Sequence, residues 1–176
     1  MSTSENIVDA AMAIVCEEGV AHLTLDAAAK RAGLSKGGVL YHFKTKDDLI
    51  RGMVQRLIDH YEELHLSYYA QEPEGPYRWA RTVVRSCFDP NGPADDPVAG
   101  VLLAVITVNP ALMQPIQAMY DLWAERVRRD SPDPERAMLI NMAMDGMILE
   151  RMMGIKLFDE QGAERLKQTA LALLTV

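Results

Sequence analysis

Apolar side chains recur three and four positions apart along nearly the whole chain, which is the spacing of one face of an α-helix. No segment alternates apolar and polar residues over the length of a strand, so the sequence predicts no β-sheet. Runs rich in proline, glycine and aspartate interrupt the helical spacing at residues 71–76, 89–97, 109–110 and 131–134. We therefore predict an all-α chain of about nine helices, separated by short turns.

The first part of the chain predicts a distinctive helical arrangement. Two short helices, over about 24–32 and 35–43, are joined at Gly33, and a long helix follows over about 46–69. Two short helices with a glycine turn form a helix-turn-helix, whose second helix enters the major groove of DNA. We expect a helix-turn-helix head in residues 1–45 and a helical body for dimerisation and ligand sensing over the rest of the chain, 46–176.

Two glycines in the first turn of the second short helix support this interpretation. Gly37 and Gly38 each cost about 1 kcal/mol of helix propensity relative to alanine. A helix that served only the fold would gain from alanine at both positions. A helix that faces the groove gains instead from the close approach of its backbone to DNA.

The charge distribution is compatible with DNA binding although the formal net charge is −7. Residues 20–56 carry seven lysines and arginines against three aspartates, so the acidic balance lies in the remainder of the chain. A basic segment on an acidic protein favours focused binding to phosphate and discourages contact elsewhere.

Residues 7–50 resemble the tetracycline-repressor (TetR) family of bacterial regulators, through the order T-x-x-x-x-A-x-x-A-G-x-S-K-G followed by YHF, K-T-K and a leucine. The resemblance implies a helical homodimer, a palindromic operator and a small-molecule pocket in the body. On matching positions it implies phosphate contacts from Thr24, Tyr41, His42 and Lys46, and base-edge or groove contacts from Ser35, Lys36, Gly37 and Gly38. Outside residues 7–50 only the general helical layout is similar.

Within this motif, Lys36 is the best candidate to read a base directly, because lysine suits the O6 and N7 atoms of guanine. The sequence departs from the family at Leu40, where an aromatic residue, often tyrosine, is usual. One phosphate hydrogen bond is then missing or replaced by an apolar contact, and Tyr41 is the candidate to compensate for it.

Two other interpretations of the same stretch fail on their context. Residues 33–37 match the G-x-S-x-G pattern, but a nucleophile elbow needs a strand before it, and here a helix precedes. His42 has no other histidine at metal-ligand spacing. We therefore expect no enzyme, no metal and no cofactor. The chain shows neither a signal peptide nor an apolar run of 18 residues, so we expect a cytoplasmic protein without membrane contact.

Methionines crowd the predicted eighth helix, and Met113 and Met119 lie on another helix. They form either a soft, gap-filling core or a plastic pocket for large apolar ligands. Tryptophan and tyrosine rings can add stacking faces for a cation, and an aspartate on the face of two methionines is either a counter-charge or a surface acid. The candidate ligand-binding residues are Trp79, Met113, Tyr120, Trp123, Met138, Met142 and Asp145.

The charge of the ligand is less constrained. Arg78, Arg81 and Arg85 lie on one stripe of the predicted fifth helix and are the best argument for an acidic ligand. Because the apolar positions of that helix fall off this stripe, we expect the arginines to face solvent. The expected effector is therefore a small hydrophobic molecule that is cationic or neutral.

The last two helices are expected to pair two protomers in a four-helix bundle, through the apolar positions Ile140, Met144, Met147, Leu166, Ala170 and Leu173. The predicted function is that of a repressor that binds a palindromic operator as a dimer and is released by its effector. Efflux or detoxification genes are the targets that the family resemblance suggests. The alternative is a DNA-binding activator or architectural protein that responds to no ligand.

Overall fold

The computed structural model describes residues 2–175 of the chain, apart from the side chains of Thr107 and Val108. Within this part every regular element is a helix, which confirms the all-α prediction and the absence of strands. None of the described helices combines the length and apolar character needed to cross a membrane. The chain divides into two compact units.

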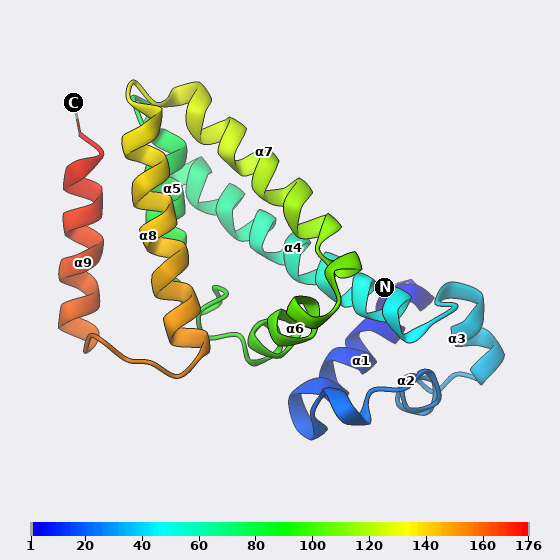
Figure 1. Cartoon of the computed structure of the whole chain (residues 1–176). Helices are drawn as coiled ribbons and strands as arrows, with labels where there is room; N and C mark the ends of the chain where they lie inside the picture. Colours follow the sequence, from blue (N-terminus) through cyan, green and yellow to red (C-terminus); the bar gives the residue numbers. More distant parts are fainter. Residues whose placement is uncertain (1, 176) are drawn as a thin grey trace. The chain divides into compact units, whose positions relative to one another are not determined.

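The described part of the chain contains nine α-helices, as the sequence predicts (Figure 1). They are α1 Thr3–Glu18, α2 Leu25–Ala32, α3 Lys36–His42, α4 Lys46–Gln71, α5 Arg78–Ser86, α6 Pro97–Val108, α7 Gln114–Asp130, α8 Pro134–Met152 and α9 Glu160–Leu173. Two single-turn 3-10 helices, which the sequence analysis did not predict, are η1 Val20–His22 and η2 Pro110–Leu112.

The first unit comprises residues 1–59 and 97–117. In it α1 packs against α2, α2 against α3, and α6 against α1. The first half of α4 belongs to this unit because its apolar side chains, Leu49, Ile50 and Met53, are buried. The first compact unit therefore includes the start of α4 and all of α6 as well as the helix-turn-helix.

Close packing in the first unit depends on Gly52 of α4. A β-carbon at this position would lie 2.9 Å from Cε1 of Phe43 and 3.2 Å from Cγ2 of Val8. Phe43 is itself buried at the end of α3, so its ring has little room to move. The glycine is thus required by the contact between α4, α1 and the end of the helix-turn-helix.

The second unit comprises residues 60–96 and 118–176. Its central element is α5, which packs against both α8 and α9. The core of this unit consists of the buried side chains Tyr77, Trp79, Ala80, Val83, Val84, Cys87, Val127, Ala137, Ile140, Met144, Met147, Ala170, Leu171 and Leu174. The apolar side of α5 thus binds the C-terminal helix pair.

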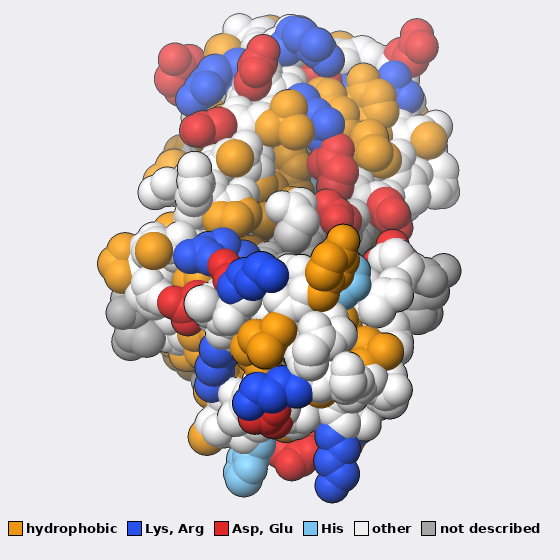
Figure 2. Space-filling model, turned by 90° about the vertical axis from the view of Figure 1, so that its right-hand side faces the viewer, with side chains coloured by type: hydrophobic (Ala, Val, Ile, Leu, Met, Phe, Trp, Pro, Cys, Tyr) orange, Lys and Arg blue, Asp and Glu red, His pale blue; other side chains and the backbone are white. Residues whose placement is uncertain are grey.

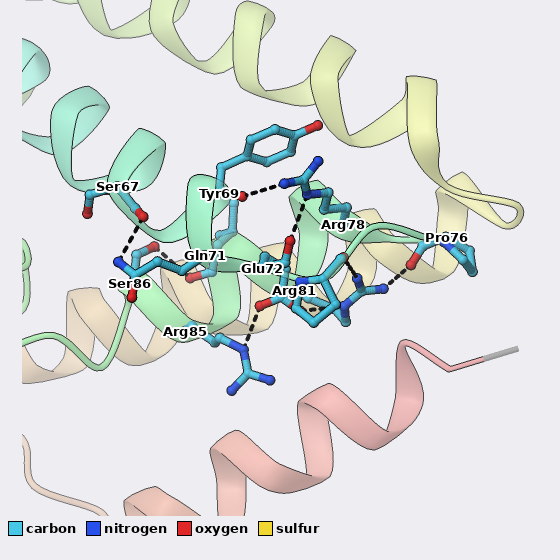
Figure 3. A network of polar contacts seen from close by, with 11 residues as sticks. Ser67, Tyr69, Gln71, Glu72, Pro76, Arg78, Arg81, Arg85 and Ser86 are labelled. Carbon is cyan, nitrogen blue, oxygen red and sulfur yellow. Dashed lines mark hydrogen bonds and ion pairs between the residues drawn. The ribbon is translucent and has the colours of Figure 1, made fainter.

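A buried acid joins the end of α4 to α5 (Figure 3). The Glu72 side chain is only 3% exposed, and each of its carboxylate oxygens accepts a hydrogen bond of 2.7 Å, one from Nε of Arg81 and one from Nε of Arg85. Arg81 also donates to the carbonyls of Pro73 and Pro76. One carboxylate therefore holds the turn and α5 together.

The third arginine of α5 is bound in the same corner. Arg78 donates 2.9 Å hydrogen bonds to the carbonyls of Glu72 and Tyr69, and its guanidinium lies 4.0 Å from the centre of the Tyr69 ring. The expectation that the arginine stripe of α5 faces free solvent is wrong. The cause is Glu72, whose buried charge has to be balanced by arginines from the neighbouring helix.

We predict that Gly52→Val lowers the free energy of unfolding by about 2 kcal/mol, because the added atoms overpack the contact with Phe43 and Val8. Denaturant unfolding followed by circular dichroism measures this loss. Gln55→Val is the matched control, because it adds the same side chain to an exposed position of α4. Equal losses in the two variants would contradict the packing role of Gly52.

Candidate DNA interface and effector site

Local hydrogen bonds build the helix-turn-helix. Oγ1 of Thr24 accepts a 3.0 Å hydrogen bond from the backbone N–H of Ala27 and caps α2. Gly33 closes α2 in the left-handed conformation at φ 70°, which favours glycine. Oγ of Ser35 accepts a 3.1 Å hydrogen bond from the N–H of Gly38 and caps α3. Both capping hydroxyls keep a proton with which to bind a phosphate.

The helix α3 has one buried and one exposed side. Val39 is completely buried against the head, whereas Lys36 and His42 are exposed and Tyr41 is 76% exposed. The Tyr41 and His42 rings meet edge to face with centres 5.1 Å apart. Leu40 is half-buried, so the exposed aromatic ring of this helix stands at Tyr41.

The internal structure of the head does not require the glycines of α3. A β-carbon on Gly37 would meet only Oγ of Ser35, at 3.9 Å, and one on Gly38 would meet the same atom at 3.5 Å, which is ordinary contact. Neither glycine has a positive φ. Packing and backbone conformation within the chain therefore do not explain the choice of glycine at these two positions.

The basic side chains of the head are largely engaged with acids. Arg31 pairs with Glu17 of α1, and Lys36 pairs with Asp26 of α2 at 2.9 Å. Arg51 and Arg56 also pair with aspartates, and Nζ of Lys46 donates to the carbonyl of Val20. Figure 2 shows blue and red side chains beside one another, rather than one large basic patch. The positive segment seen in the sequence is thus balanced in space by nearby acids.

In the second unit, Glu62 of α4 is a centre of polar contacts with α7. Its carboxylate accepts a 2.9 Å hydrogen bond from Nε1 of Trp123 and hydrogen bonds from Arg126. Burial raises the pKa of Glu62, but these hydrogen bonds outweigh it and hold the pKa below its usual value. The buried His65 ring lies 4.3 Å from the Trp123 ring, and burial lowers the pKa of His65 to about 4.

Further rings continue this cluster towards α5. Trp79 stacks on Tyr69 with ring centres 4.1 Å apart, and the Arg126 guanidinium lies 4.7 Å from the centre of the Trp79 ring. The Tyr120 ring lies near Trp123, at 6.1 Å between ring centres. We call this set of side chains from α4, α5 and α7 the aromatic cluster: His65, Tyr69, Trp79, Tyr120 and Trp123.

Asp145 of α8 borders the aromatic cluster through Tyr120. Burial raises the pKa of Asp145 to about 6, against the opposing effect of the Tyr120 hydroxyl nearby. Burial also raises the pKa values of Tyr120 and of the neighbouring Cys87, so both stay neutral at physiological pH. Among the described side chains, no lysine or arginine forms an ion pair with Asp145.

Several buried polar atoms in the second unit have no hydrogen-bond partner within the described part of the chain. They come from α4, α5, α8 and the end of α7 with the turn after it: His65 Nδ1, Trp79 Nε1, Thr82 Oγ1, Asn141 Oδ1, Asp130 Oδ1 and Ser131 Oγ. Leaving such atoms unpaired is costly, and they are the groups with which a bound molecule can form hydrogen bonds.

The predicted ligand residues fall into separate places. Trp79, Tyr120, Trp123 and Asp145 form or border the aromatic cluster. Of the methionines, Met138 packs against the core of the second unit, Met142 is 65% exposed on α8, and Met113 belongs to the first unit.

The sequence analysis missed three side chains of this site, Glu62, His65 and Arg126. The Glu62–Arg126 pair joins residues that lie 64 positions apart, which no local pattern reveals. His65 had a signal, because it follows the buried Tyr61 by one helical turn.

The predicted dimer residues lie mostly in the core, with one on the surface. Ile140, Met144, Met147 and Ala170 are buried in the core of their own chain, and Leu166 packs against that core. Only Leu173 is well exposed. The outward face of α8 carries a different apolar stripe: Leu139, Met142, Ala143, Gly146, Leu149 and Met153 at its end.

Two family models together match most of the chain. The model of bacterial regulatory proteins of the tetR family matches residues 7–53, and the tetracyclin repressor-like C-terminal domain matches residues 77–175. The HTH-type transcriptional regulator AcrR of Shigella flexneri is 32% identical over 82 residues, which are 47% of this chain and 38% of AcrR. The match to this curated relative thus spans less than half of its length.

Solved structures show the same fold over nearly the whole chain. The multidrug binding protein EbrR complexed with ethidium aligns with a TM-score of 0.73 and 20% identity over 98% of each chain. Its complex with malachite green aligns with a TM-score of 0.68 and 22% identity, again over 98% of each. A TetR family member from Streptomyces coelicolor A3 has a TM-score of 0.73 and 21% identity, with full coverage of both chains.

The C-terminal match alone covers more than half of the chain, and the N-terminal match contains the whole helix-turn-helix. The TetR resemblance noted in the sequence is confirmed. This chain belongs to the TetR family and is a DNA-binding transcriptional regulator, not an enzyme.

Proposed function

We propose that this regulator is a ligand-responsive repressor. In this proposal it binds a palindromic operator as a homodimer and leaves DNA when a small, hydrophobic and cationic molecule binds beside the aromatic cluster. The observation that carries the proposal is Asp145, a partly buried carboxylate without a basic partner among the described side chains.

A partly buried carboxylate without a counter-charge is unfavourable, so a cation bound next to Asp145 gains from its charge. The rings of Tyr120 and Trp123 stand close by and offer faces to a delocalised positive charge. This combination of rings and one acid favours a bulky aromatic cation.

The arginines of the second unit argue against an acidic effector. Arg126 is engaged with Glu62, and Arg81 and Arg85 are engaged with Glu72. An acidic ligand that recruited Arg126 would leave the partly buried Glu62 uncompensated, and one that recruited Arg78 would compete with the carbonyls of Glu72 and Tyr69 that this arginine already binds. The fold neighbour EbrR, which has been seen with ethidium and malachite green, supports the same choice of ligand class.

The outward stripe of α8 supports a homodimer. Leu139 is 69% exposed, and Met142, Leu149 and Met153 are also exposed, so this stripe is a large apolar surface for a monomer to leave in water. A β-carbon on Gly146, in the middle of the stripe, would meet nothing within 4 Å of its own chain. We propose that α8 and α9 of two protomers pack through this stripe and Leu173, in place of the buried residues that the sequence suggested.

Release from DNA is proposed to act through α4. This helix begins in the head at Lys46 and continues without interruption to Gln71, past Glu62 and His65. If a ligand binds more tightly to one orientation of α4, it increases the fraction of molecules in which the head takes the orientation that goes with it. Efflux or detoxification genes are the targets that suit an effector of this kind.

Footprinting of the DNA upstream of the gene, followed by titration with ethidium, tests the proposal. The expected result is a symmetric footprint that ethidium removes at concentrations where it does not displace an unrelated repressor from its own operator. An operator complex that persists at saturating ethidium, malachite green and other lipophilic cations would contradict a cationic effector.

We predict that Leu149→Lys converts the dimer into a folded monomer, because the residue is exposed on the outward stripe of α8. Met144→Lys, on the buried side of the same helix, should unfold the second unit instead. Sedimentation velocity and circular dichroism separate these two outcomes. If Leu149→Lys remained a dimer at micromolar concentration, the stripe would not be the interface.

We predict that ethidium binds about tenfold more weakly at pH 5 than at pH 7, because Asp145, with a pKa of about 6, is mostly protonated at the lower pH. His65 has a pKa of about 4 and stays neutral in this range. Asp145→Asn should bind ethidium weakly at both pH values, as measured by fluorescence titration. Tyr120→Phe is a control that keeps the carboxylate. A pH dependence that survives in Asp145→Asn would exclude this residue as the counter-charge.

We predict that Gly37→Ala raises the free energy of unfolding by about 1 kcal/mol and weakens operator binding. The opposite signs arise because the added methyl group favours the helix but separates its backbone from DNA. Thermal unfolding and mobility-shift titration measure the two effects. Unchanged operator affinity would show that the glycine does not approach DNA.

A further inference from the structure

The ion pair between α2 and α3 has no evident role in holding the head together. Asp26 is the second residue of α2 and Lys36 the first residue of α3, and Nζ of Lys36 lies 2.9 Å from Oδ2 of Asp26. Their side chains are 64% and 62% exposed, respectively, and an ion pair this exposed contributes little to stability. The pair nevertheless stands at the start of the recognition helix, where side chains reach base edges.

We propose that Asp26 and Lys36 together read one G·C base pair, with Asp26 as a second base-reading residue. In a G·C pair, guanine O6 accepts a hydrogen bond of about 2.9 Å from cytosine N4. The acceptor and the donor on the major-groove edge are thus as far apart as Nζ and Oδ2 in the ion pair. The ion pair and the base pair can therefore meet edge to edge, and neither has to open.

The hydrogen bonds in this arrangement form a closed ring. Nζ of Lys36 donates one proton to Asp26 and another to guanine O6. The N4 amino group of cytosine donates one proton to O6 and its second proton to the Asp26 carboxylate. Each of the two acceptors receives two hydrogen bonds, and the lysine keeps a third proton for guanine N7.

The same geometry discriminates against the other three base pairs. When the G·C pair is reversed, the carboxylate faces O6 and the ammonium faces the N4 amino group, so both contacts are repulsive. A·T places its N6 donor against the lysine and its O4 acceptor against the carboxylate. T·A offers the correct donor and acceptor, but adenine N7 then lies on the carboxylate side and the thymine methyl group on the lysine side.

The negative charge of Asp26 sharpens this discrimination, because DNA repels a carboxylate that receives no hydrogen bond from a base. A lysine alone would gain affinity on any sequence through its charge. The acid lowers affinity for every site that lacks the amino group in the right place. Asp26 is accordingly a specificity-determining residue, and this role requires DNA binding by the head but not the proposed effector.

The test uses the full-length protein and operator half-sites selected from randomised DNA. In the selected site, the cytosine of each specified G·C pair is replaced in turn by 2-pyrimidinone, which lacks the N4 amino group. At the G·C pair that the ion pair reads, this replacement should weaken binding of the wild-type protein about tenfold, whereas it should weaken binding of Asp26→Ala less than twofold. Asp26→Asn, which keeps an acceptor oxygen, should lose an intermediate amount.

Glu17→Gln is the matched control, because it removes another exposed acid of the head, one that pairs with Arg31 of α2. It should respond to 2-pyrimidinone as the wild type does, and its salt-dependent binding shows that the head functions. Thermal unfolding checks that Asp26→Ala is folded. The proposal is overturned if selection specifies no G·C pair, or if Asp26→Ala loses as much affinity on 2-pyrimidinone DNA as the wild type.

Discussion

The buried charge of Glu72 determines how the helices of the second unit pack. A carboxylate this deeply enclosed needs close partners for its charge, and Arg81 and Arg85 supply them. Because these arginines come from α5, their pairing fixes α5 against the end of α4, and α5 in turn provides the apolar side on which α8 and α9 pack. Glu62 is likewise bound by Arg126 and Trp123, and these contacts join α7 to α4.

Asp145 is the acid on which the proposed function depends. Asp145 is partly buried, yet the described side chains offer it a tyrosine hydroxyl and no cation. Glu62 and Glu72 each have an arginine partner, and the half-buried Asp130 accepts a hydrogen bond from the backbone N–H of Trp79, with arginine charges nearby. Within the described part of the chain Asp145 has no such cation, so it is suited to a charged partner from outside the chain. In the head, the exposed Asp26–Lys36 pair is again better explained by an external partner than by stability.

The helices and their caps could be predicted because they depend on neighbouring residues. Thr24, Gly33 and Ser35 act within one turn of helix, and the structure uses them as the sequence suggests. The face of α8 could not be assigned from the sequence, because apolar residues occupy both sides of the helix. Ile140 and Leu139 differ by one position, about 100° around the axis, and only packing shows that the first is buried and the second exposed. The environments of Glu62 and Glu72 likewise depend on partners from other helices.

In the proposed mechanism, binding of the effector and binding of the operator weaken one another, although the two sites are separate. Isothermal titration of ethidium into the free regulator and into its operator complex, corrected for ethidium binding to the operator DNA alone, measures this coupling, because linkage makes the effect reciprocal. Operator DNA should weaken ethidium binding by the same factor by which ethidium weakens operator binding. Equal affinity of ethidium for the free and the DNA-bound protein would contradict this mechanism.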